Sequence, residues 1–281
     1  ESLDRLVDHL IGAEVDGLFV LGSSGQVAYL SDADRDTVVA RVAERAAGRV
    51  PVLAGVPDLT APRIADQARR AEAHGADALV VTAPLYAIND VVEIDRHFRM
   101  IAAAAATPVY AYDVPVRVGT KLGLPLLMAL AADGVIAGVK DSSGDDVAHR
   151  RLIAANRAAG RPLTILTGHE VVCDGIFLMG GDGAVPGLGN VDPAGYVRLW
   201  RAAQAGDWAA VRAEQDRLAA LFEIAFVPIG RSGDAGGIGA FKMALESLGI
   251  IASSAQPAPL AGLTEADRTA IDEILRGVGL L

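Results

Sequence analysis

The stretch ADALVVTAPLYAINDVVEIDRHFRMIAAAAATPVYAYDVP, residues 76–115, holds two apolar runs on either side of a helical segment. The first run begins at Asp77 and the second at Thr107. Both are apolar nearly throughout rather than alternating, as expected for parallel strands covered on both faces. The stretch therefore predicts one strand–helix–strand unit with parallel strands.

The same unit recurs along the chain. Seven apolar runs begin near residues 16, 50, 77, 107, 135, 163 and 182, so most gaps are about 30 residues, the length of one βα unit. Ser31 and Thr60 stand at helix-capping positions of two intervening segments, which end near Gly48 and Gly75. The pattern predicts an α/β fold, a (β/α)8 TIM barrel whose first strand would precede Glu1. An open doubly wound sheet is the alternative; we favour the barrel because no long crossover reverses the strand order.

The last third of the sequence is wholly helical in pattern. Pro193 marks the start of a helix that we expect to be the eighth of the barrel. Three further helical segments follow, near 207–226, 235–249 and 264–277. We therefore expect a barrel over residues 1–206, and a C-terminal helical extension over residues 207–281 packed on it.

Composition limits the possible partners. The chain has 281 residues, of which 52% are hydrophobic and 21% charged, which is enough to close a sizeable core. A net charge of −10 without a basic run argues against nucleic acid as a partner. The single cysteine, Cys173, cannot form an internal disulfide, which fits a reducing cytoplasm. No apolar run is long enough to span a bilayer, so no membrane association is expected.

In a parallel barrel the carboxyl ends of the strands surround one mouth, where catalysis takes place. Lys140 ends the run at 135–141, and in isolation it would be a surface charge. Inside a barrel mouth an amine loses hydration, which favours its neutral form. A neutral lysine amine attacks a ketone to form a Schiff base, and the protonated imine then serves as an electron sink without any cofactor.

Four motifs occur in order along the chain: GSSGQ with LSDADR, YDVPVRVG, GVKDSSGD and GGDGAVPGLGN. Together they resemble the dihydrodipicolinate synthase/N-acetylneuraminate lyase family, pyruvate-using class I aldolases, synthases and dehydratases on a (β/α)8 barrel. The resemblance is clear from Glu1 to about Asn190, and a helical tail is typical of the family. It implies a lyase that needs no metal and no cofactor beyond the covalent imine. It also implies a homo-oligomer, either a dimer or a dimer of dimers (a homotetramer).

The resemblance implies a role for each matching residue. Lys140 would form the imine with pyruvate or another 2-oxo acid, and Tyr112 would carry protons to and from the substrate. Ser23 would join Tyr112 in a proton relay. Ser24, together with the hydroxyl and backbone N–H groups before Gly25, would hold the substrate carboxylate.

Three further positions match the family. Tyr86 would reach across a dimer interface to complete the relay of a neighbouring subunit. Val185 would line the pyruvate pocket through its backbone, and Arg117 would bind the carboxylate of the second substrate. Without the resemblance, Tyr86 is an interface aromatic and Arg117 a solvated cation. Tyr110 is expected to face the helices and to serve in packing.

Several polar residues are expected to be structural. The five histidines show no metal-ligand spacing, although His169 with Glu170 lies at the mouth and is a candidate for substrate contact. Asp141 is expected to cap a helix or neutralise a neighbour. Lys242, on a helical segment, is also expected to be structural.

The chain departs from the family pattern at four positions: Gln26 replaces a Glu, Leu85 a Tyr, Asp113 an Asn and Pro186 a Ser. Asp113 would place an extra acid beside Tyr112. The pyruvate half of the site is intact, whereas the half that recognises the second substrate is altered.

The departures leave four functions open. The first is 4-hydroxy-tetrahydrodipicolinate (dihydrodipicolinate) synthase proper, and the second is a 2-keto-3-deoxy sugar-acid aldolase or dehydratase. The third is a non-catalytic homologue that binds a 2-oxo acid. The fourth is a phosphate-binding barrel enzyme that uses the loop at 180–190.

Overall fold

A computed structural model describes the whole chain, residues 1–281. Its seven strands are β1 (Leu18–Val20), β2 (Val52–Gly55), β3 (Ala78–Thr82), β4 (Val109–Asp113), β5 (Gly138–Asp141), β6 (Thr164–Thr167) and β7 (Gly183–Ala184). They form one parallel sheet in chain order, with β1 and β7 at its edges. A doubly wound sheet reverses its strand order, so that alternative is wrong.

Helices surround the sheet and follow it in the chain. The α-helices are α1 (Ser2–Gly12), α2 (Asp32–Ala46), α3 (Ala61–Ala73), α4 (Val91–Ala104), α5 (Pro115–Val118), α6 (Leu124–Ala132), α7 (Asp146–Ala158), α8 (Cys173–Met179), α9 (Pro193–Ala205), α10 (Trp208–Phe222), α11 (Gly239–Ser247) and α12 (Glu265–Gly277). Short turns complete the set: the 3₁₀ turns η1 (Val27–Tyr29), η2 (Leu188–Asn190) and η3 (Glu223–Phe226), and the π-helical turn η4 (Asp234–Ile238).

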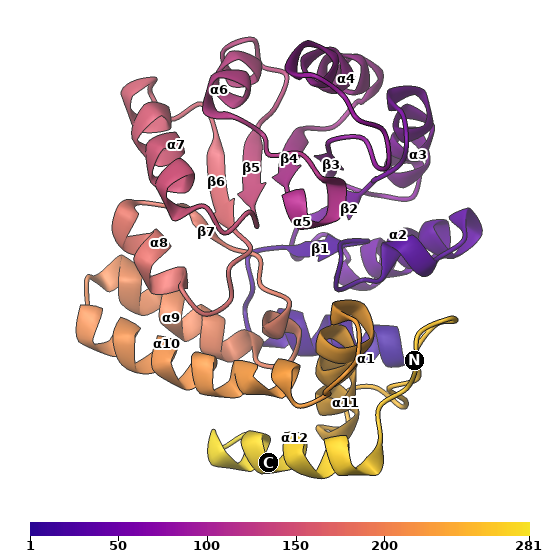
Figure 1. Cartoon of the computed structure of the whole chain (residues 1–281), viewed down its shortest axis with the longest axis vertical. Helices are drawn as coiled ribbons and strands as arrows, with labels where there is room; N and C mark the ends of the chain where they lie inside the picture. The colour runs from indigo at the N-terminus through magenta and orange to yellow at the C-terminus, as the bar shows by residue number, and fades with distance from the viewer.

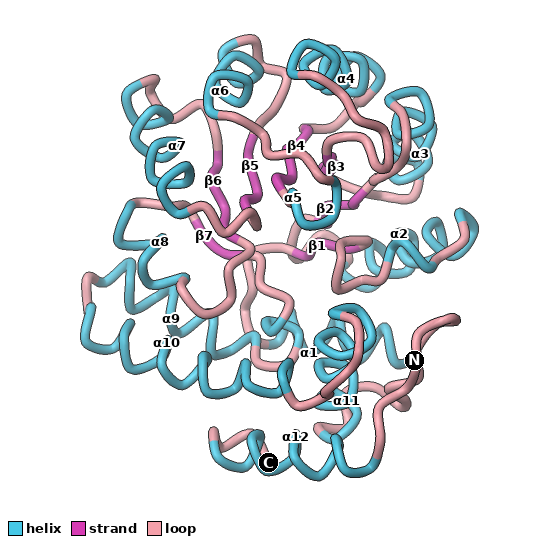
Figure 2. Tube along the Cα trace, viewed as in Figure 1, coloured by secondary structure: helices cyan, strands magenta, loops and turns pink.

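The arrangement is that of a curled sheet inside a ring of helices. Figure 1 shows α3, α4, α6 and α7 outside the strands, and α9 to α12 gathered on one side of the molecule. Figure 2 shows how short the strands are relative to the helices around them. None of the helices combines the length and the apolar character that crossing a membrane requires.

Local sequence signals account for the helix starts. The Ser31 side chain accepts a hydrogen bond from the Asp34 N–H, and the Asp34 carboxylate accepts one from the Ser31 N–H, which closes a capping box on α2. Asp90 and Glu93 do the same for α4. Thr60 occupies the predicted cap position of α3, but its side chain makes no capping bond.

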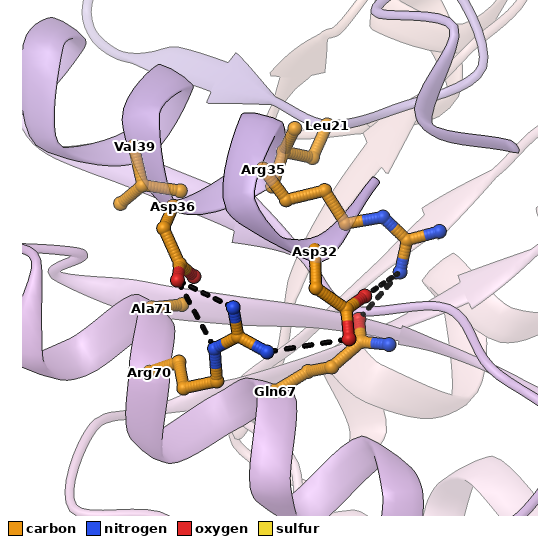
Figure 3. Close-up of a pocket in the computed structure, with 8 residues that line it drawn as sticks. All are labelled: Leu21, Asp32, Arg35, Asp36, Val39, Gln67, Arg70 and Ala71. Atoms are coloured by element: carbon orange, nitrogen blue, oxygen red, sulfur yellow. Dashed lines mark hydrogen bonds and ion pairs between the residues drawn. The ribbon is translucent and has the colours of Figure 1, made fainter. Parts of the chain in front are cut away.

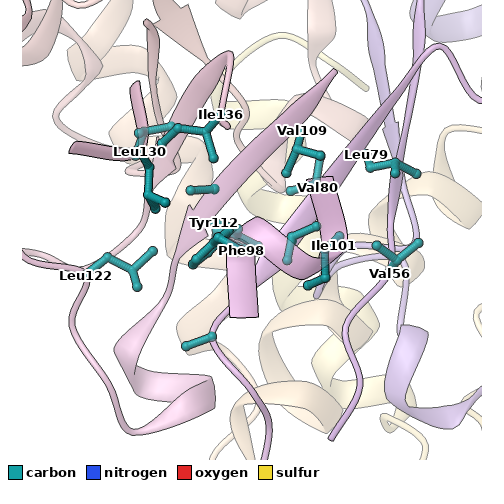
Figure 4. Close-up of a cluster of buried hydrophobic side chains, with 14 of the residues drawn as sticks. Val56, Leu79, Val80, Phe98, Ile101, Val109, Tyr112, Leu122, Leu130 and Ile136 are labelled. Atoms are coloured by element: carbon teal, nitrogen blue, oxygen red, sulfur yellow. The ribbon is translucent and has the colours of Figure 1, made fainter. Parts of the chain in front are cut away.

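The sheet packs its outer face against the helices. Neighbouring strands pair Val81 with Ala111, Ala111 with Val139, and Val139 with Ile165, and each of these side chains is at most 1% exposed. This row belongs to a cluster of 33 buried residues that includes Phe98 and Ile101 of α4, seen in Figure 4. Because successive strand residues point to opposite faces, the residues next to these in the sequence face the interior of the curled sheet.

The C-terminal helices have a core of their own. Seventeen buried residues form this second cluster, among them Leu218 of α10, Phe241 of α11 and Ile271 of α12. The same cluster takes in Phe177 of α8 and Leu188 of η2. The last helices are therefore joined by apolar packing to the segments that follow β6 and β7.

An ion-pair network ties α2 to α3. The guanidinium of Arg70 pairs with Asp36 at 2.5 Å and with Asp32 at 3.3 Å, and Arg35 donates to Gln67 at 2.9 Å, as Figure 3 shows. Most of these side chains are partly exposed, so the network contributes little net stability. The network also holds the Arg35 guanidinium against α3, through its hydrogen bond to Gln67.

Candidate active site

One row of side chains crosses three strands and faces the interior. Thr82 of β3 pairs with Tyr112 of β4, which pairs with Lys140 of β5. Paired residues of a sheet point to the same face. Lys140 Nζ lies 4.3 Å from the centre of the Tyr112 ring and 4.8 Å from that of Phe19, and the Lys140 side chain is only 9% exposed. Lys140 is therefore an interior amine held between two aromatic rings, and not a strand-end charge in solvent.

Two glycines, Gly138 on β5 and Gly168 just after β6, leave room for the side chains around this row. A Cβ on Gly168 would overlap Ser142 Oγ and lie 3.1 Å from Lys140 Cε. A Cβ on Gly138 would overlap the ring of Tyr110. The prediction that Tyr110 faces the helices is wrong, because residues two apart on a strand share a face. Tyr110 does serve in packing, but one layer below Tyr112 on the inner face.

The Tyr112 hydroxyl lies among the groups that a proton relay needs. Burial would raise its pKa, but the charge of Lys140 and hydrogen bonds with Ser23, Ser142 and Lys140 outweigh burial and lower the pKa below its ordinary value of 10.0. A phenol with a lowered pKa exchanges its proton more readily near neutral pH. The structure thus brings Lys140, Tyr112 and Ser23 together, as predicted, and adds Ser142.

The loop after β1 has a constrained backbone. Leu21 and Gln26 have φ values of 58° and 53°, which are unusual for residues other than glycine. The N–H of Gln26 donates to the Ser23 carbonyl at 3.0 Å, and the loop leads into the short turn η1 rather than directly into α2. Ser24 and Gly25 lie inside this tight loop. Strained backbone of this kind is common at binding sites.

The loop after β7 meets the loop after β1. Glu170 Oε1 accepts hydrogen bonds from the N–H groups of Gly187, at 2.6 Å, and Leu188, at 3.3 Å. A Cβ on Gly187 would lie 2.6 Å from Ser24 Oγ and 2.7 Å from Glu170 Oε1, so the three residues are in close contact. The Val185 N–H donates to the carbonyl of Thr167 at 2.7 Å, which holds the strand end in place.

Glu170 is the most perturbed carboxyl of this region. Its second oxygen, Oε2, is buried without a hydrogen-bond partner. Burial raises its pKa to about 7, against the lowering effect of the Gly187 and Leu188 N–H groups and of the Lys140 charge. A carboxyl with this pKa is protonated in about half of the molecules at pH 7, and its protonated form can donate a hydrogen bond to an anion beside Ser24.

A cavity of about 320 Å³ extends from Tyr112 and Ser23 to the loop that follows β4. Arg117, on α5, is one of the lining residues, and we call the part of the cavity beside it the far end. Its binding of a second substrate stays a prediction. Its guanidinium pairs with Asp234 of η4 at 2.5 Å, and the Tyr29 hydroxyl donates to the same carboxylate at 3.0 Å. The C-terminal helices thus contribute directly to the wall of the cavity.

Other predicted residues lie outside this cavity. Tyr86 is 97% exposed, with a φ of 66°, and does not line this cavity. Its neighbour Leu85 lines the cavity instead. Lys140, Ser24, Gly25 and Val185 do not line it either, although Lys140 pairs in the sheet with Tyr112, which does. The His169 ring lies 3.8 Å from the position of a Cβ on Gly144, and His169 is not among the lining residues.

The acid expected beside Tyr112 faces the other way. Asp113 is fully buried, accepts the Leu122 N–H at 3.0 Å, and forms an ion pair with Lys121. Asp141 shares Lys121 at 3.5 Å and accepts the Ser143 N–H at 2.7 Å, so its predicted structural role agrees with these contacts. Asp113 was misplaced because consecutive strand residues alternate between the two faces.

Three residues of the site were missed from the sequence, and only two of them had any signal there. Ser142 lies two positions after Lys140, so alternation along the strand could have placed it on the same face. Thr82 needed the strand register, and its buried Oγ1 has no hydrogen-bond partner. Asp234 carried no signal, because it comes from a distant helical segment. No group of three or more His, Cys, Asp or Glu side chains is arranged to hold a metal ion.

Comparison with known proteins identifies relatives of this chain. An uncharacterized DapA-like lyase of Halobacterium salinarum is 34% identical over all of this chain and 90% of the relative. The 4-hydroxy-tetrahydrodipicolinate synthase of Ruegeria pomeroyi is 33% identical over all of this chain and 93% of the relative.

Solved structures agree. A prophage protein of E. coli K12 from the dihydrodipicolinic acid synthase family, determined in complex with pyruvate, superposes with a TM-score of 0.92 at 28% identity, covering 99% of this chain and 92% of the other. The dihydrodipicolinate synthase of Bacteroides thetaiotaomicron gives a TM-score of 0.92 at 29% identity over the same shares of the two chains. The model of the Dihydrodipicolinate synthetase family matches residues 1–277. The resemblance seen in the four motifs is confirmed: the chain belongs to the dihydrodipicolinate synthetase family, a family of lyases.

Proposed function

We propose that this protein is a class I lyase that forms a Schiff base between Lys140 and pyruvate or a related 2-oxo acid. The observation that carries the proposal is the position of the Lys140 amine, which is buried between two aromatic rings, 4.8 Å from the centre of Phe19 and 4.3 Å from that of Tyr112. The pyruvate complex of the E. coli prophage relative supports the choice of substrate.

The reaction would begin with attack of the neutral Lys140 amine on C2 of the 2-oxo acid. Tyr112 would protonate the resulting oxyanion and take up the proton that the nitrogen loses, giving a carbinolamine. Tyr112 would then protonate the hydroxyl, which leaves as water, so that a protonated imine and a Tyr112 phenolate remain. Removal of a proton from C3 gives the enamine, which attacks an aldehyde carbonyl and forms a carbon–carbon bond; the reverse sequence cleaves one. Ser23 and Ser142 would hold the Tyr112 proton in position through their hydrogen bonds.

The substrate carboxylate would lie at the junction of the two edge loops. Ser24 would donate its hydroxyl there, helped by the N–H groups of the loop around Gly25 and by protonated Glu170. The backbone at Val185 would line the same pocket. The N–H groups of Gly187 and Leu188 already bind Glu170, which argues against the alternative of a phosphate site in this loop.

We extend the proposal to the fold and the assembly. We infer a (β/α)8 barrel with a helical extension over residues 207–281, supported by the superposition on solved relatives. Tyr86 and Ile88 are 97% and 100% exposed on one loop, where a partner could cover both side chains. We infer that a second copy covers them, and that Tyr86 completes the partner's proton relay in a dimer or a dimer of dimers.

The candidate functions differ in the second substrate that the enzyme would use. Relatives such as the Ruegeria pomeroyi protein favour a 4-hydroxy-tetrahydrodipicolinate synthase, and Arg117 in the cavity is compatible with it. The changes at Gln26, Leu85 and Pro186 favour an aldolase or dehydratase of 2-keto-3-deoxy sugar acids. A non-catalytic binder would retain the pyruvate adduct but turn over neither kind of partner.

Borohydride trapping tests the Schiff base sharply, because the chain has only three lysines. Lys121 is held by two carboxylates, which raise its pKa, whereas burial lowers the pKa of Lys242, which makes Lys242 the competing nucleophile. After incubation with pyruvate and reduction, the intact mass should show one adduct per chain, mapped to Lys140. Lys140→Ala should abolish it, and Lys242→Arg should not. An adduct on Lys242, or none on folded protein, would refute the proposal.

A further inference from the structure

The far end of the cavity carries an arginine that is already paired. Arg117 Nη2 lies 2.5 Å from Asp234 Oδ1, and Asp234 Oδ2 accepts the Tyr29 hydroxyl at 3.0 Å. All three residues line the cavity that also contains Tyr112. The Asp234 side chain is 17% exposed and that of Arg117 is 41% exposed, so the pair lies at the boundary between the cavity and solvent.

The pair is a true ion pair at neutral pH. Burial alone would raise the pKa of Asp234, but the ion pair with Arg117 and the hydrogen bond from the Tyr29 hydroxyl hold it below the ordinary value of 3.8. A guanidinium stays protonated at any physiological pH. The far wall therefore presents one positive and one negative group with no net charge.

No second cation replaces the one that Asp234 neutralises. Arg35 also borders the cavity, but its Nη2 donates to the Val27 carbonyl at 3.0 Å and its Nη1 to Gln67 at 2.9 Å. Figure 3 shows this guanidinium turned toward the α2–α3 network. A carboxylate entering at the far end would thus have to share Arg117 with Asp234.

The remaining groups suit hydroxyls instead. Arg117 has five N–H donors in all, Asp234 offers carboxylate lone pairs, and the Tyr29 oxygen can accept a hydrogen bond. Asp234 begins the π-helical turn η4, a rare geometry that is frequent at functional sites. A polyhydroxylated chain can use donors and acceptors together, whereas a carboxylate can use only donors.

We propose that Asp234 is a specificity-determining residue that neutralises Arg117, so that the second substrate is a hydroxylated aldehyde without a distal carboxylate. The proposal rests on the proposed lyase function and deepens it, because it names the class of the second substrate. The corresponding cleavage substrate is a 2-oxo-3-deoxy sugar acid whose only carboxylate is the one next to the keto group.

The test compares two aldehydes on the same pyruvate-loaded enzyme. Glyceraldehyde carries hydroxyls, and succinic semialdehyde carries a distal carboxylate; kcat/KM for aldol product is measured for each by mass spectrometry. The wild-type protein should prefer glyceraldehyde. Asp234→Asn keeps the size of the side chain but frees the Arg117 charge, and should shift the ratio at least tenfold toward succinic semialdehyde. The double variant with Arg117→Gln should lose that gain.

The matched control removes a carboxylate from an ion pair far from the cavity. Glu14→Gln breaks the surface pair with Arg201, whose side chains are more than 60% exposed, and should leave the ratio unchanged. A wild-type preference for succinic semialdehyde, or a ratio in Asp234→Asn that stays within twofold of wild type, would overturn the proposal.

Failure of the proposed lyase function can be distinguished from failure of the proposal for Asp234. The pyruvate adduct is measured first for every variant, and its absence from wild type refutes the Schiff base alone. The inference that Asp234 neutralises Arg117 is then tested by succinate binding, measured as a thermal shift, because this assay needs no turnover. Succinate should stabilise Asp234→Asn more than wild type or Glu14→Gln, and equal shifts in all three would refute it.

Discussion

Replacing Glu170 with glutamine should change how stability depends on pH. Glu170 Oε1 accepts two backbone N–H bonds from the loop after β7, and its Oε2 is buried without a partner. An amide at this position keeps the oxygen acceptor but never ionises. The variant Glu170→Gln therefore isolates the cost of a buried carboxylate from the packing of the same side chain.

The sign and size of this pH effect on stability follow from the pKa of Glu170. Burial raises the Glu170 pKa to about 7, whereas the ordinary value of 4.5 applies to the unfolded chain. Between these values the folded state holds a proton that the unfolded state has lost, so stability falls as pH rises. The full difference corresponds to about 3 kcal/mol, and it is complete once the pH exceeds about 8.

Urea unfolding at one protein concentration, from pH 4 to pH 8.5, measures the effect. Wild type should lose about 3 kcal/mol relative to Glu170→Gln across this range. His97 and His149, whose pKa values are lowered by burial, are present in both proteins, so their contribution cancels in the difference. Pyruvate trapping should also weaken above pH 7 in wild type only, because ionised Glu170 repels the substrate carboxylate near Ser24. A flat difference in stability would refute the argument.

Three further outcomes are expected. Gly168→Ala should reduce the rate of pyruvate adduct formation by about 100-fold in the trapping assay, because its Cβ overlaps Ser142 and displaces the row beside it. Tyr112→Phe should still bind pyruvate but form the adduct 10²- to 10⁴-fold more slowly in stopped-flow trapping, roughly the contribution of general acid–base catalysis. Gln26→Glu should raise the thermal midpoint by about 2 °C or more at pH 8, because it gives Lys242, now 3.4 Å from an uncharged amide, an opposite charge. An unchanged rate in either of the first two variants, or a lower midpoint in the third, would contradict the corresponding reasoning.

Much of the fold was predictable because its signals are local. Each strand is a short apolar run, and the helices between them begin at residues such as Ser31, whose capping box forms as the sequence indicates. The sequential order β1 to β7 follows from units that repeat without a long crossover. Thr60 shows the limit, because a cap position predicted from residue type need not make the bond.

Side-chain direction was less predictable than element order. Lys140 and Tyr112 meet as expected, since both end neighbouring strands on the inner face. Asp113 and Tyr110 were misplaced because the face of a residue depends on strict alternation from a known reference point. Once the register is known, Asp113 turns outward to Lys121 and Tyr110 turns inward.

The sequence by itself determined the family and pointed to Lys140, Tyr112 and the loop serines as candidate site residues, because these belong to short motifs whose chemistry is local. Only the tertiary structure decided what surrounds them. Asp234 is separated from Arg117 by more than a hundred residues, and Glu170 reaches the loop after β7 through a space that Gly187 leaves open. Such contacts depend on how distant helices and loops pack together, and no periodicity or spacing along the chain encodes that distance.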